Sequence, residues 1–63
     1  MGGFKKELDE SIRYNAADEE STASALRDTA KEHEKAGNYR QASVYYKAAA
    51  KAEDRAKVWR KLL

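Results

Sequence analysis

Apolar residues recur every three or four positions along most of this chain, a spacing typical of helices that bury one face. In the first quarter four apolar residues fall four apart: Phe4, Leu8, Ile12 and Ala16. This stripe predicts a first helix over residues 3–16. Asn15 and Asp18 supply side-chain oxygens of the kind that cap helices, so we expect a break there and a new helix start near Asp18.

A second helix is expected over residues 19–36, with Ala23, Leu26, Ala30 and His33 on its buried side. Glu19 and Glu20 suit its first turn, where negative charge is favourable. Gly37 can adopt the left-handed backbone conformation that ends helices, and Asn38 can cap the next one. This segment is the strongest local signal in the chain.

A third helix is expected over residues 39–62. Six of its residues, and Leu63 directly after it, follow a strict three-four spacing, which is the a/d pattern of a coiled coil: Ala42, Tyr45, Ala49, Ala52, Ala56, Trp59 and Leu63. Tyr46 widens this seam near its start. Small residues fill the middle of the seam and large ones its ends. The pattern therefore predicts an all-α fold of three helices in a single domain, residues 1–63.

Composition narrows the choice of class. The chain has 63 residues, no Cys and no Pro, and 38% of its residues are charged. It has no apolar run of the roughly 20 residues that a membrane-spanning helix needs, and no apolar signal core near its start. We therefore expect a soluble cytoplasmic protein. A chain of this size has a marginal core, which favours a fold supported by a partner.

Charge is unevenly distributed along the chain. Residues 1–36 carry six Lys and Arg against nine Asp and Glu, whereas residues 37–63 carry seven against two. The acidic first half and basic second half favour antiparallel self-association or contact with an acidic partner.

Residues 23–56 resemble a single tetratricopeptide repeat, a helical hairpin of 34 residues with the pattern W-x2-L-G-x2-Y, A-x3-F and P. The matching positions are Leu26, Thr29, Ala30, His33, the turn Gly37-Asn38-Tyr39, then Ala42, Tyr46 and Ala49. The final Pro is replaced by Asp54, which suggests that the last helix continues past the usual repeat end. The stretch GNYRQASVYY also resembles the second-helix start of microtubule-interacting-and-trafficking domains. Both families are protein-binding modules.

The tetratricopeptide resemblance implies a candidate partner groove. The face that lines the concave groove in that family would here carry Ser24, Arg27, Asp28, Lys31 and Lys35. Such a groove would bind an acidic peptide or chain terminus. The alternative is a solvated face with local ion pairs, such as Asp28 with Lys31.

A second candidate site is the third-helix seam, because one helical hairpin cannot bury its own apolar faces. We expect a self-association surface made by Tyr45, Tyr46, Ala49, Ala52, Ala56, Trp59, Leu62 and Leu63. A homodimer or larger homo-oligomer would bury it.

Other chemistry receives little support from the sequence. His33 is the only histidine and is flanked by Glu32 and Glu34, but neighbouring residues on a helix point in different directions, so packing is favoured over metal binding. No catalytic constellation or cofactor motif is present. We expect a non-enzymatic interaction or adaptor module. The alternatives are a small inhibitor of a larger protein, of phage or antitoxin type, and a basic nucleic-acid-binding protein that uses the third helix.

Overall fold

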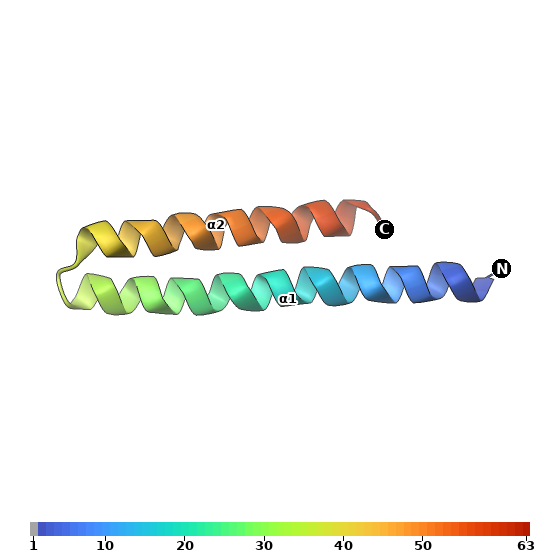
Figure 1. Ribbon diagram of the computed structural model, residues 1–63, viewed down its shortest axis with the longest axis horizontal. Helices are drawn as coiled ribbons and strands as arrows, with labels where there is room; N and C mark the ends of the chain where they lie inside the picture. Colours follow the sequence, from blue (N-terminus) through green and yellow to red (C-terminus); the bar gives the residue numbers. More distant parts are fainter. Residues whose placement is uncertain (1) are drawn as a thin grey trace.

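The computed structural model describes residues 2–63, with side chains from Phe4 onward. Two helices, α1 (Gly2–Lys35) and α2 (Tyr39–Lys61), form an antiparallel hairpin (Figure 1). The hairpin is a thin rod with extents of 55 × 14 × 8 Å. Because α1 has 34 residues and α2 has 23, the N-terminal end of α1 extends beyond the C-terminal end of α2 (Figure 1).

The expected arrangement of three helices is wrong, because the helices predicted over residues 3–16 and 19–36 are one continuous helix. Residues 15–20 contain no Gly or Pro, and Ala16 and Ala17 are strong helix formers. Asp18 does not cap a helix; its carbonyl lies within α1 and accepts a hydrogen bond from the Thr22 hydroxyl at 3.0 Å. Ala16 is fully buried, so packing against α2 also favours an unbroken helix at this point.

The turn between the helices follows the prediction. Gly37 has φ of +80°, the left-handed conformation that favours glycine. The Gly37 amide donates to the Glu34 carbonyl at 2.9 Å, and the Asn38 amide donates to the His33 carbonyl at 2.8 Å. These two bonds form a Schellman motif, which satisfies carbonyls at the end of α1. Asn38 occupies the N-cap of α2, but its side chain makes no capping hydrogen bond.

The core is a narrow seam of alanines. Among residues 4–63 the buried apolar residues are Ile12 and seven alanines. Three of these alanines lie in α1 and four in α2: Ala16, Ala23, Ala30, Ala42, Ala49, Ala52 and Ala56. In α1 the alanines recur every seven residues, as do three of those in α2, so both helices present a coiled-coil seam. Alanine side chains let two helix backbones lie close together, but each contributes little apolar area.

Larger residues occupy the other seam positions and are half-buried. On α1 these are Glu19, Leu26 and His33, and on α2 they are Tyr45 and Trp59. Leu26 packs against a buried cluster of Ala23, Ala49 and Ala52. The His33 and Tyr45 rings stack, with centroids 5.3 Å apart and planes 14° from parallel. The hairpin therefore combines an alanine centre with large side chains at the edge of the seam.

Candidate functional site

One flank of the hairpin is charged and ties the two helices together. It is formed by residues seven apart on each helix, Glu20, Arg27 and Glu34 on α1 and Tyr46, Glu53 and Arg60 on α2. Arg27 forms an ion pair with Glu53, and Arg60 with Glu20. We call this set the charged flank.

The third position of the charged flank joins a phenol to a carboxylate. The Glu34 carboxylate, as hydrogen-bond acceptor and as a negative charge, raises the pKa of the Tyr46 hydroxyl above its usual value. One further ion pair reaches the seam itself, where the Arg55 guanidinium donates from Nε to the Glu19 carboxylate at 3.0 Å. Alanines alone specify register weakly, so these polar links favour one alignment of α2 along α1.

The residues of the predicted partner groove are divided between two hollows on α1. Arg27 belongs to the charged flank and lines a shallow hollow with Glu20, Glu53 and Lys57. Asp28, Lys31 and Lys35 line a different hollow near the turn, together with Thr29 and Glu32. Lys35 pairs with Glu32 at 3.6 Å, and Ser24 is exposed. Binding of an acidic peptide by this face therefore stays a prediction.

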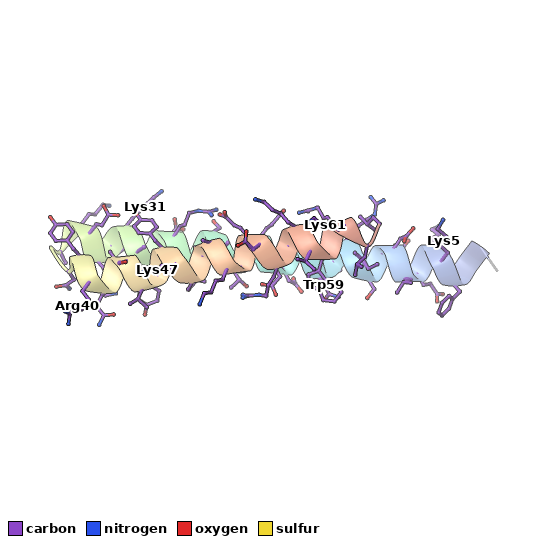
Figure 2. The ribbon with its side chains drawn as sticks, turned by 90° about the horizontal axis from the view of Figure 1, so that it is seen from above. Lys5, Lys31, Arg40, Lys47, Trp59 and Lys61 are labelled. Atoms are coloured by element: carbon purple, nitrogen blue, oxygen red, sulfur yellow. The ribbon has the colours of Figure 1, made fainter. Side chains whose placement is uncertain are left out.

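The predicted self-association seam is divided between the inside and outside of the hairpin. Ala49, Ala52 and Ala56 are buried inside it, so they are not available to a second chain. Tyr45, Tyr46 and Trp59 are half-buried along its edges. Leu62 and Leu63 are 62% and 51% exposed. Figure 2 shows Trp59 and Lys31 at opposite edges of the rod.

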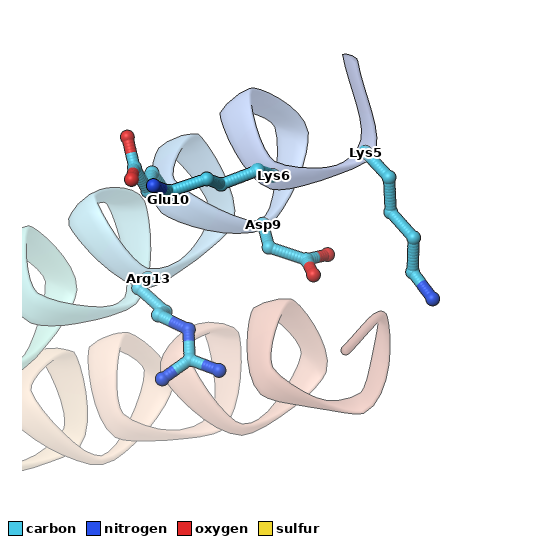
Figure 3. Close-up of a pocket in the computed structure, with 5 residues that line it drawn as sticks. All are labelled: Lys5, Lys6, Asp9, Glu10 and Arg13. Carbon is cyan, nitrogen blue, oxygen red and sulfur yellow. The ribbon is translucent and has the colours of Figure 1, made fainter. Parts of the chain in front are cut away.

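The sequence reasoning missed a third region, the part of α1 that precedes its first buried residue, Ile12. When residues of the two helices are matched outward from the turn, Leu63 lies level with Ile12. Residues 2–11 extend beyond this level, and we call them the overhang. Phe4 is 74% exposed and Leu8 is 51% exposed. Lys5, Lys6, Asp9, Glu10 and Arg13 line a shallow hollow here, and Figure 3 shows Asp9 directed toward the end of α2. The sequence analysis missed this region because it placed a helix break near Asp18. Residues 2–11 extend beyond α2 only when α1 is one continuous helix.

The basic residues of α2 are partly committed to the hairpin. Arg55 and Arg60 form ion pairs with α1, whereas Lys47 lies on the outer surface of α2 (Figure 2). Two basic residues of the expected third helix are therefore paired within the chain. Within residues 2–63 no cluster of three or more His, Cys, Asp or Glu residues is placed to hold a metal ion. Neither helix, over the residues described, has an apolar stretch sufficient to cross a bilayer.

Comparison with protein-family models, with curated proteins and with solved structures found no match for this chain.

Proposed function

We propose that this chain is a non-enzymatic protein-interaction hairpin, which folds stably only when another protein chain covers its outer apolar side chains. One observation carries the proposal: small residues are inside and large ones outside. Over residues 4–63, seven of the eight buried apolar residues are alanine. In the same part of the chain eight large apolar residues are exposed by half or more: Phe4, Leu8, Tyr14, Tyr39, Val44, Val58, Leu62 and Leu63.

The free-energy balance supports this reading. Burying one methyl group contributes about 0.8 kcal/mol, whereas a fully buried Leu or Phe contributes about 1.5–3 kcal/mol. An alanine seam therefore provides little of the stability that ordering 63 residues requires. Covering the exposed large side chains would supply the remainder by removing their apolar area from water. Tyr is also among the residues that contribute most to the energy of protein interfaces, and Tyr14 and Tyr39 are exposed.

This role is the adaptor role expected from the sequence, but the interaction surface is the outside of the hairpin instead of the seam of α2. The partner contacts the outside of the hairpin, because α1 and α2 already cover the alanines of the seam. We place the chain in the cytoplasm on the grounds of composition given above. Half-buried Trp59 and exposed Leu62 are the strongest candidate anchors on α2.

The test is the folding of the isolated chain measured by far-UV circular dichroism and light scattering over a wide range of concentrations. We expect helicity that depends on association: either an oligomer that becomes helical as it forms, or a weakly helical monomer. A monomer that is fully helical at every concentration and unfolds cooperatively would refute the proposal, because its alanine seam would then be sufficient.

A further inference from the structure

We propose that two copies of this chain associate head to head through their overhangs, each overhang filling the space beside the other that α2 leaves uncovered. This inference rests on the proposed function and names the partner as a second copy. Three features of the structure support it: the length of the overhang, the order of its charges, and the positions of its apolar side chains.

The first feature is length. In each copy the overhang, residues 2–11, lies beyond the level of Leu63, and within residues 2–63 no helix lies beside it (Figure 1). The uncovered space is therefore as long as one overhang, about 15 Å at the rise of an α-helix. A second overhang running antiparallel fits this space, and its amino end then meets the end of the partner's α2. A two-fold axis relates the copies, so the same contact forms twice and the assembly closes as a dimer.

The second feature is charge order. Continuing the seam of α1 toward its N-terminus places Asp9 and Lys5 at the positions that face the uncovered space. Figure 3 agrees, because Asp9 points toward the end of α2 and Lys5 extends past it. In an antiparallel pair of overhangs Lys5 of each copy lies opposite Asp9 of the other, and the neighbouring Lys6 and Glu10 follow the same order. A sequence that is basic first and acidic second is thus complementary to itself.

Pairing also relieves an unfavourable feature of the single hairpin. The first turn of α1 contains no acidic residue, and Lys5 and Lys6 lie close to this positive end of the helix dipole. Acidic residues from the second copy offset that charge.

The third feature is the apolar side chains. Phe4 and Leu8 lie beside the seam on the side opposite to the charged flank, by the helical spacing. In the two-fold dimer, the sides that carry Phe4 and Leu8 in the two copies lie on the same face of the assembly. Leu8 of each copy comes next to its symmetry mate, and Phe4 approaches the partner's Leu62 and Leu63. Four exposed apolar residues per chain are then covered together, which is the cluster that a stable interface requires.

The first experiment measures the shape of the oligomer by small-angle X-ray scattering, with its mass from light scattering. Two 55 Å rods that overlap only at their overhangs give a dimer about 95 Å long. A dimer about as long as one hairpin, or an oligomer larger than two, would overturn the overhang interface while leaving the proposed function intact. A weakly helical monomer would do the same, whereas a stable, fully helical monomer would overturn both.

The second experiment reverses the charges. Lys5→Glu with Lys6→Glu makes the overhang acidic, and Asp9→Lys with Glu10→Lys makes it basic. Each variant alone should dimerise at least about tenfold more weakly than the wild type, and an equimolar mixture should recover a mixed dimer. The matched control is Lys47→Glu with Lys51→Glu, which makes the same change on the exposed face of α2 and should leave dimerisation unchanged. Failure of the mixture to recover would refute the charge pairing.

The third experiment uses the absence of cysteine from the chain. Leu8→Cys should form a disulfide-linked dimer under mild oxidation, because the two Leu8 positions are adjacent across the two-fold axis. Val44→Cys, equally exposed but near the turn, should not. Linking that is as fast in the Val44 variant as in the Leu8 variant would show random collision and count against the interface.

Discussion

Substituting Ala23→Leu tests whether the alanine seam is closely packed. Ala23 is fully buried in the centre of the seam, in contact with a cluster that contains Ala49, Ala52 and Leu26. If the helices moved apart freely, three more buried carbons would stabilise the hairpin by up to about 2.4 kcal/mol. If they cannot, forcing a larger side chain into the seam costs about 1–3 kcal/mol.

We expect the second result, a net loss of about 1–2 kcal/mol in the free energy of unfolding. Separating the helices at Ala23 would also remove close contacts on either side, because alanines continue the seam seven residues away in both directions, at Ala16 and Ala30. The gain at one position is therefore offset by losses at its neighbours. For a chain of this size each 1 kcal/mol lowers the midpoint of thermal unfolding by about 4–8 °C.

The assay is urea unfolding followed by far-UV circular dichroism, with all variants at one chain concentration. The control is Ala25→Leu, two residues away on the exposed face of the same helix. Ala and Leu have similar helix propensities, so this control should change stability by less than about 0.5 kcal/mol. Ala23→Leu that is as stable as Ala25→Leu, or more stable, would refute the close packing of the seam.

Three further predictions concern the turn and the charged flank. Gly37→Ala should lose about 1–2 kcal/mol in the free energy of unfolding, because φ is +80° at this position. An added Cβ meets no atom within 4 Å, so the cost is conformational. Gly37→Asn should lose less in the same urea unfolding experiments, and equal losses would contradict this account. Glu53→Gln should lose about 0.2–1 kcal/mol at low salt and almost nothing at high salt, since its ion pair with Arg27 is partly exposed; a loss that persists in high salt would contradict it. The raised pKa of Tyr46 makes its contribution to stability fully present below pH 10.0 and lost as pH rises through the folded-state pKa; an ultraviolet titration of Glu34→Gln should show that pKa lowered, and an unchanged value would exclude Glu34 as the cause.

Substitutions in the charged flank and in the overhang should have different effects. The charged flank is occupied by contacts within the chain, through Arg27, Glu53, Glu20 and Arg60. At the end of the rod opposite the turn, the overhang extends beyond α2 and carries the exposed Phe4 side chain. Variants of the overhang should therefore affect association, whereas variants of the charged flank should affect the unfolding of the hairpin itself.

The sequence by itself determined the helical class, the turn and the seam of α2. Absence of Pro, the three-four spacing of apolar residues and the placement of Gly37 are local properties, and local backbone preferences suffice to set them. The same spacing placed Ala23 and Ala30 on a buried side, and both are buried. It also placed Ala49 and Ala56 on an apolar seam, but that seam was assigned to a second chain and is buried within the hairpin.

The tertiary structure decided the rest. Capping residues such as Asp18 occur in helix interiors as well as at helix starts, so the sequence alone placed a break where packing of Ala16 against α2 keeps α1 continuous. The ion pair of Arg27 with Glu53 joins residues far apart in the chain, so the helical spacing of the sequence does not predict it. The overhang is a difference between two helix lengths, which exists only once both helices are placed side by side.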